Sequence, residues 1–246
     1  MPAGLESGLT PSVIPVAARI GSAGEVLLLS GYPTQLTIGL LLTLGGVAPR
    51  LVDGRLSMTY IVSVWLIDAI MIFALVALLA RARGVALKDV LLGSRPIGRE
   101  LLLGLILVPV VFGFVVVVLF AERQWWPALH NVATNPFEDL IGSPGQAAVL
   151  VLMAVVSGGI KEEVQRAFIL RRFEEHLGGA WVGLVVFSVL FGAGHFLQGW
   201  DVGVVTALLG VFWGVLYLQR RSVAAAAVSH SGFNVAQILQ YLVLAS

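Results

Sequence analysis

The chain has 246 residues, of which 58% are hydrophobic and only 12% are charged. A soluble domain carries about 45–50% apolar and about 25% charged residues, so this composition excludes one and indicates a membrane protein. The chain has no cysteine, which excludes disulfide frameworks, thiolate metal sites, lipid-anchored cysteines and cysteine proteases. The formal net charge is +1, so no surplus of positive charge favours binding to nucleic acid.

Apolar runs long enough to cross a bilayer recur along the whole chain. A hydrocarbon core of about 30 Å needs roughly 20 apolar residues in a helix. The sequence therefore predicts an all-α fold, a polytopic transmembrane helix bundle of about seven spans, or eight if the N-terminal stretch also crosses. The predicted spans cover residues 28–48, 57–80, 101–120, 147–170, 180–199, 202–219 and 223–245.

The N-terminal residues 1–27 are expected to form a separate segment. Within it, Thr10 to Ala23 is typical of an interfacial helix and not of a cleaved signal, because it lacks a basic start, an apolar run and a small-residue cleavage site. Residues 28–246 are expected to form a single transmembrane domain, with a motif-bearing core at 147–240.

Loop charges predict the orientation, because Lys and Arg in short loops are retained on the cytoplasmic side. From the second predicted span onward the loops alternate between basic and acidic, which places the N-terminus in the cytoplasm and the C-terminus outside. The residues concerned are Arg81, Arg83, Lys88, Arg95, Arg99, Glu122, Glu138, Asp139, Arg171, Arg172, Asp201, Arg220 and Arg221. The loop with Arg50, Asp53 and Arg55 disagrees weakly. The Gly-, Ala-, Val- and Arg-rich, Lys-poor composition favours a prokaryotic plasma (inner) membrane.

Ionisable side chains inside a span cost about 2.5–3.5 kcal/mol each even on insertion scales, so each one indicates a function. The fourth predicted span carries a charged run from Lys161 to Arg166. Residues three and four apart share a helix face, so Arg166 lies beside Glu162 and Glu163. One carboxylate can then pair with the arginine while the other points into a cavity. The competing interpretation is the charged cytoplasmic end of a helix.

Three other predicted spans carry polar groups. Asp68 lies in the second span, His195 in the fifth, and His230 with Asn234 on one face of the seventh. In the competing interpretation, each of these groups merely forms a hydrogen bond between helices. Asp68 could also reach a basic group such as Lys161. In a dry medium, however, such groups are most economically satisfied by one another. Carboxylate, imidazole and amide together could activate a water and stabilise an oxyanion, or they could bind a metal.

The polar residues of these predicted spans resemble the motifs of the CPBP family. This family comprises the CAAX proteases and bacteriocin-processing membrane proteases and includes the type II CAAX prenyl endopeptidases. The family's pattern is Glu-Glu-x-x-x-Arg, then Phe-x-x-x-His, then His-x-x-x-Asn. Phe191 and His195 complete the second motif, and His230 and Asn234 complete the third. The resemblance covers roughly residues 147–240. The first motif is one residue short, so either of its glutamates can be the base.

The resemblance implies an intramembrane endopeptidase that hydrolyses peptide bonds with a glutamate-activated water. The candidate catalytic residues are Glu162, Glu163, Arg166, His195, His230 and Asn234. In that scheme Glu162, which we favour, or Glu163 is the base, and Arg166 fixes the glutamate. His195 helps to hold the water, and His230 with Asn234 stabilises the oxyanion. No cofactor is expected, the alternative being a divalent metal such as zinc held by Glu162, His195 and His230.

The expected partners are membrane lipid and a peptide or membrane-protein substrate, with no nucleic acid. The sequence does not set the substrate or the oligomeric state. Two other functions stay open: a non-catalytic CPBP-type scaffold or immunity protein, and an ion- or proton-coupled carrier that uses Asp68 and the glutamate pair. The absence of internal repeats argues against the carrier.

The predicted span boundaries do not by themselves bring the motifs together. At about 1.5 Å per residue, Glu162 and His230 lie nearer the cytoplasmic side and His195 nearer the outside. We therefore expect a break at Gly158-Gly159 or Gly178-Gly179 and different boundaries for the fifth span. We also expect the site to lie in one cavity, reached from the cytoplasmic side.

Overall fold

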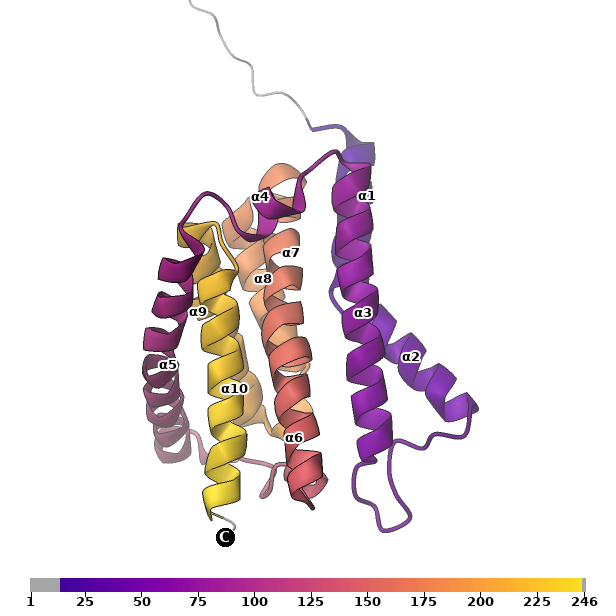
Figure 1. The fold of residues 1–246 in the computed structure, drawn as a ribbon, viewed down its shortest axis with the longest axis vertical. Coiled ribbons are helices and arrows are strands. Elements are labelled where there is room, and N and C mark those ends of the chain that lie inside the picture. Colours follow the sequence, from indigo (N-terminus) through magenta and orange to yellow (C-terminus); the bar gives the residue numbers. More distant parts are fainter. Residues whose placement is uncertain (1–13, 245–246) are drawn as a thin grey trace, which may run out of the picture.

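A computed structural model describes residues 14–244, and within this range the regular secondary structure is helical, without a strand (Figure 1). The α-helices are α1 (Val16–Leu29), α2 (Tyr32–Leu44), α3 (Met58–Ala82), α4 (Leu87–Leu91), α5 (Ile97–Trp125), α6 (Pro144–Met153), α7 (Glu162–His176), α8 (Ala180–Ala193), α9 (Trp200–Arg220) and α10 (Ala224–Leu244). The expected all-helical fold is confirmed. Residues 10–13 of the predicted interfacial helix lie outside the described residues.

The first predicted span is interrupted. Gly31 takes a left-handed conformation (φ 84°), and α1 and α2 meet there at 46°. A break of this kind exposes carbonyl groups that need donors. The side-chain amide of Gln165, from α7, donates to the carbonyl oxygen of Leu29 at the end of α1. Residues 28–48 are therefore not one straight helix, because the chain bends at Gly31.

The predicted number of about seven spans is not confirmed. By length and composition α3, α5 and α9 could cross a membrane, and α1 with α2 makes a fourth if the bent pair is one span. The helices α6, α7 and α8 do not count as spans because of their charge or their length. The continuous helix through α6 and α7 contains the charged run from Lys161 to Arg166, and α8 has only 14 residues.

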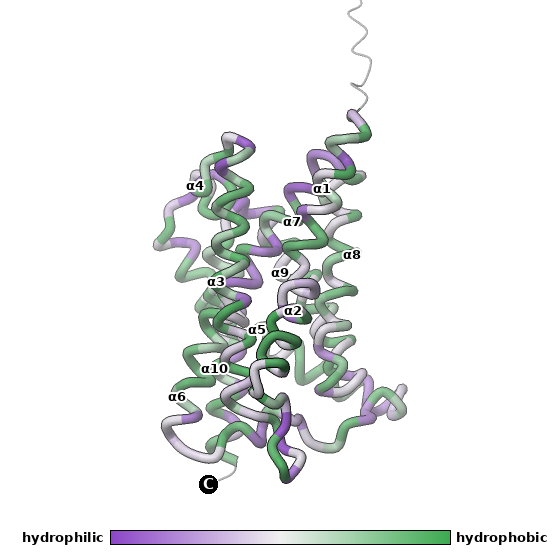
Figure 2. The backbone as a smooth tube through the Cα atoms, turned by 90° about the vertical axis from the view of Figure 1, so that its right-hand side faces the viewer, coloured by the Kyte–Doolittle hydropathy of each residue, from purple (hydrophilic) through white to green (hydrophobic). Residues whose placement is uncertain are grey.

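Apolar side chains cover the outside of the bundle as well as its core. On α5 the exposed residues include Leu102, Leu105, Ile106, Val117 and Phe120, which is the pattern of a lipid-facing helix. Hydrophilic residues gather toward the two ends of the molecule (Figure 2). The chain is thus built as an integral membrane protein.

Two hydrophobic clusters hold the helices around the site. Leu29, Ile72, Val76 and Phe168 belong to a cluster that joins α1, α3, α7 and α8. Val111, Val205, Trp213, Ala226 and Phe233 belong to a cluster that joins α5, α9 and α10.

A π-helical segment, η3 (Ala154–Lys161), joins α6 to α7. Such segments are rare in proteins, but those that occur often lie at functional sites. The wider turn displaces side chains from the α-helical register. At Gly159 a Cβ would lie 2.9 Å from the Cβ of Ser231, so glycine is required for α10 to pack this closely. The helix is therefore not broken at Gly158-Gly159, one of the two places where we expected a break, but widens there into a π-helical turn.

The fifth predicted span also ends earlier than expected. Helix α8 stops at Ala193, and the chain then turns through η4 (Phe196–Gln198) into α9. His195 consequently lies in the turn and not inside a helix. Gly178 and Gly179, both at positive φ, form the turn that precedes α8.

Candidate active site

One cavity of about 690 Å³ contains residues from all three motifs. Glu162, His195, His230 and Asn234 line it, and they come from α7, the α8–α9 turn and α10. Its volume lies within the range of about 300–1,000 Å³ that is usual for ligand sites. The structure therefore brings these four sequence-predicted residues together, while Glu163 and Arg166 lie behind them.

The two adjacent glutamates have different surroundings. Glu163 is buried, with 1% of its side chain exposed, and forms an ion pair with Arg166, which is fully buried. Glu162 is 20% exposed and faces the cavity. The pairing expected between Arg166 and one of the glutamates is thus present, at a spacing of three residues, and the shortened motif still permits it.

Aromatic rings surround the guanidinium of Arg166. It lies 5.0 Å from the ring centre of Phe191, 5.6 Å from that of Phe187 and 5.8 Å from that of Trp213. A cation over aromatic faces in a desolvated site gains about 2 kcal/mol or more. Arg166 is therefore held on several sides, and it fixes Glu163 in turn.

His230 is positioned by one aromatic ring and two carboxylates. Its ring stacks on Trp213 with 3.7 Å between ring centres. Its Nδ1 lies 2.9 Å from Glu163 Oε1, which accepts the hydrogen bond, and its Nε2 lies 3.7 Å from Glu162 Oε2. The imidazole is therefore placed between the buried glutamate and the glutamate that faces the cavity.

His195 has a defined tautomer when it is neutral. Its Nδ1 donates to the carbonyl oxygen of Phe191 at 2.9 Å, and a carbonyl can only accept. In the neutral ring Nε2 is then unprotonated and can accept a hydrogen bond from a molecule in the cavity.

Asn234 completes the third motif from the next turn of α10. Its Nδ2 lies 3.5 Å from the carbonyl oxygen of Ala154 in η3, which is a long and weak hydrogen bond. A Cβ at Gly158 would lie 2.6 Å from this nitrogen. The glycine therefore leaves room for the amide at the edge of the cavity.

Lys161 and Asp68 form a second buried ion pair beside the site. Lys161 Nζ lies 3.0 Å from Asp68 Oδ2 and 3.9 Å from Glu162 Oε1. Thr34 donates to the other oxygen of Asp68 at 2.5 Å, and Gln35 adds a further bond at 3.1 Å. The contact between Asp68 and Lys161 that the sequence left open is thus present.

The alternative with a bound divalent metal requires at least three ligating side chains placed close together. No group of three or more His, Asp or Glu side chains in residues 14–244 is arranged to hold a metal ion. The alternative set of Glu162, His195 and His230 faces one cavity, but it does not form such a group.

The cavity opens in a direction that the sequence did not predict. We expected access from the cytoplasmic side, where the basic loops lie. Instead, the outer lining includes Arg123 at the end of α5, Glu138 in the α5–α6 loop and Gln240 near the end of α10. Burial, and then the neighbouring charge of Asp139, raises the pKa of Glu138 above its ordinary value. Access is therefore from the end opposite to the basic loops.

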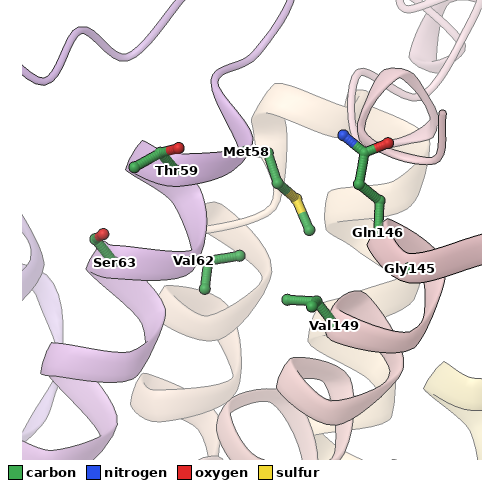
Figure 3. A pocket seen from close by; sticks show the side chains of 7 residues that line it. All are labelled: Met58, Thr59, Val62, Ser63, Gly145, Gln146 and Val149. Atoms are coloured by element: carbon green, nitrogen blue, oxygen red, sulfur yellow. The ribbon is translucent and has the colours of Figure 1, made fainter. Parts of the chain in front are cut away.

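A smaller hollow of about 290 Å³ lies between the first turns of α3 and α6 (Figure 3). Met58, Val62 and Val149 form its apolar part, while the amide of Gln146 accepts from the backbone of Gly142. Its lining contains no titratable side chain and no motif residue. It is therefore not part of the candidate site.

Comparison with protein families agrees with the motif order and its placement. Residues 144–236 match the family model described as Rce1-like, type II CAAX prenyl endopeptidase Rce1-like. Residues 144–236 are thus similar to this family, which confirms the resemblance to the CPBP family that the motifs predict. No curated protein and no solved structure matched the chain.

Two residues of the Rce1-like region matter more than the sequence indicated. Trp213 stacks on His230 and also faces Arg166, although it lies near the middle of a predicted span. Tryptophan prefers membrane interfaces, so a tryptophan at this position is a signal of an unusual environment. Gln165 lies in the first motif at a position that the family pattern leaves unspecified, and its side chain supports the end of α1.

Proposed function

We propose that the chain is an intramembrane endopeptidase in which Glu162 activates a water molecule for attack on a peptide carbonyl. The observation that carries this proposal is the contrast between the two glutamates. Glu163 is occupied by Arg166 and His230, whereas Glu162 faces the cavity. A carboxylate with access to water is the one that can take up its proton. Glu162 is therefore the base, and Glu163 is the residue that orders its neighbours.

His195 helps to place the water. Because its Nδ1 is engaged with Phe191, its Nε2 is the nitrogen that accepts from the cavity. The attacking water then donates one hydrogen to Glu162 and the other to His195. As the oxygen attacks the carbonyl carbon, the proton moves to Glu162, which later delivers it to the leaving amide nitrogen.

When the water attacks the carbonyl carbon, negative charge develops on the carbonyl oxygen, and this oxyanion needs hydrogen-bond donors. Asn234 can provide Nδ2–H at little cost, because its bond to Ala154 is long. The Nδ1–H of His230 is directed at Glu163, so His230 donates from Nε2 only as an imidazolium.

A non-catalytic scaffold is the second candidate, and the shortened first motif is the observation that favours it. Cells that produce the wild type, Glu162→Gln or the control Glu174→Gln distinguish the two functions. Glu174 forms an exposed ion pair with Arg221 at the far end of the molecule. If the protein is a protease, specific peptide fragments disappear from the membrane proteome and peptide pool only in Glu162→Gln cells. Unchanged fragments and phenotype at equal protein levels would support the scaffold.

A further inference from the structure

The cavity reaches only one end of the bundle. Its inner lining includes Lys161, Glu162 and Trp213, and its outer lining includes Arg123 and Leu244. We call the end formed by residues 126–143, the α8–α9 turn and the last turn of α10 the mouth end. We call the opposite end, formed by residues 83–99, 171–179 and 218–223, the basic end. Among the described residues, none from those three basic-end segments lines the cavity.

Charge is distributed unequally between the two ends. The basic end and the helix termini next to it carry Arg81, Arg83, Lys88, Arg95, Arg99, Arg171, Arg172, Arg220 and Arg221. The mouth end carries Arg123 with Glu122, Glu138, Asp139 and Asp201. Short loops rich in Lys and Arg stay in the cytoplasm, whereas acidic residues contribute little to orientation. The basic end is therefore cytoplasmic, and the mouth end faces the other side.

The α2–α3 loop lies at the same end as the mouth and contains two arginines, so it needs separate consideration. Arg55 forms an ion pair with Asp53 at 2.7 Å, and Arg50 donates to the carbonyl oxygen of Gly54. Both arginines are engaged within their own loop. This loop weakens the charge difference between the ends but does not reverse it.

The lining of the mouth favours a polypeptide. Gln237 and Gln240 contribute side-chain amides that can both donate and accept, as a peptide backbone requires. Two further amides of the lining, those of Asn135 and Gln198, are hydrogen-bonded to each other at 3.1 Å. The charges of Arg123 and Glu138 oppose one another, so the mouth does not select for a strongly charged headgroup. Apolar walls, such as Leu119, continue from the mouth toward the catalytic groups.

We propose that the substrate is a polypeptide segment presented on the non-cytoplasmic side of the membrane, which enters between the α5–α6 loop and the end of α10. This inference rests on the proposed function, because it names the substrate class of the same site. A cytoplasmic chain terminus would meet the basic end, from which no described residue leads into the cavity. The site therefore serves peptides or membrane-protein segments that have already been translocated.

The natural absence of cysteine makes accessibility directly measurable. Single cysteines are introduced into the full chain as Gln240→Cys at the mouth, Gln237→Cys inside it and Lys88→Cys at the basic end. Lys88 and both glutamines are exposed. Intact bacterial cells that produce each variant are treated with a membrane-impermeant maleimide, before or after lysis. We expect both glutamine positions to react in intact cells and Lys88→Cys to react only after lysis.

The opposite pattern, or reaction of all three positions in intact cells, overturns the inference. If Gln240→Cys does not accumulate, Glu138→Cys supplies the same information from the α5–α6 loop. Labelling requires no catalysis, so its result is independent of the proposed function. If the glutamine positions react in intact cells but the protein hydrolyses no peptide, the proposed function is wrong and the proposed orientation stands. If they react only after lysis and peptide hydrolysis depends on Glu162, the orientation is wrong and the function stands.

Discussion

Lys161 Nζ lies 3.0 Å from Asp68 Oδ2, and these side chains are 3% and 0% exposed. The pair joins α3 to the last residue of η3, directly before the glutamate that faces the cavity. A buried ion pair contributes little net stability compared with apolar residues, but loss of one partner leaves an uncompensated charge. The pair therefore fixes where α7 begins relative to α3, and so it fixes the position of Glu162.

A double-mutant cycle tests this relationship. Asp68→Asn and Lys161→Met should each lower the free energy of unfolding by about 3–5 kcal/mol, because each leaves one buried charge unpaired. The double variant should be clearly more stable than the additive sum of the single changes. Unfolding of the detergent-solubilised protein by denaturant measures all four species. Asp53→Asn, in an exposed pair with Arg55, is the control and should change stability by about 0–1 kcal/mol.

The two adjacent glutamates should separate activity from stability. Glu162→Gln should reduce peptide hydrolysis by about 10²–10⁴-fold, the usual contribution of a general base, with little change in stability. Glu163→Gln should instead destabilise the protein by about 3–5 kcal/mol, because Arg166 is then buried without a carboxylate. Equal stability losses in both variants would contradict the roles assigned to them.

The close packing of η3 on α10 should depend on glycine. In Gly159→Ala the new Cβ would lie 2.9 Å from the Cβ of Ser231 and 3.0 Å from its Cα. Overpacking of this kind costs about 1–3 kcal/mol and would displace α10 together with His230. Gly98→Ala is the matched control, since a Cβ there meets nothing within 4 Å. We expect reduced stability and activity for the first variant only, measured by thermal unfolding and peptide hydrolysis.

Chelators should leave hydrolysis unchanged. The proposed chemistry requires Glu162, His195, His230 and Asn234 but no metal, so EDTA or 1,10-phenanthroline should not affect the rate of the purified protein. Apparent affinity for added zinc should also be the same in the wild type and in His195→Ala. A loss of activity that zinc restores would instead favour the alternative in which these side chains ligate a metal.

Contacts within one helix can be predicted from the sequence, whereas contacts that depend on turns between helices cannot. Helix periodicity places Arg166 beside both Glu162 and Glu163, so it predicts a pair with one of them, and the structure shows that this one is Glu163. The predicted span at residues 180–199 places His195 inside a helix. The structure places it in a turn, which ends at Gly199 with a φ of 124°.

The direction of cavity access could not follow from hydropathy. Access depends on which side chains fill the space between helices that are distant in sequence. Phe168 and Ile169 pack against Ile72 and Val76 toward the basic end, while Asn135 and Gln237 line the open end. Hydropathy records each of these residues separately, so it located the polar groups but not the route to them.

Hydrolysis in ¹⁸O-labelled water tests the central claim most directly. Purified wild type and Glu162→Gln protein, reconstituted in lipid vesicles, would be incubated with a library of prenylated and unprenylated peptides, and the products would be analysed by mass spectrometry. The account predicts new C-termini carrying one ¹⁸O with the wild type and their loss with Glu162→Gln at equal protein content and stability. Equal amounts of labelled product from both proteins, or no labelled product from the wild type, would contradict it.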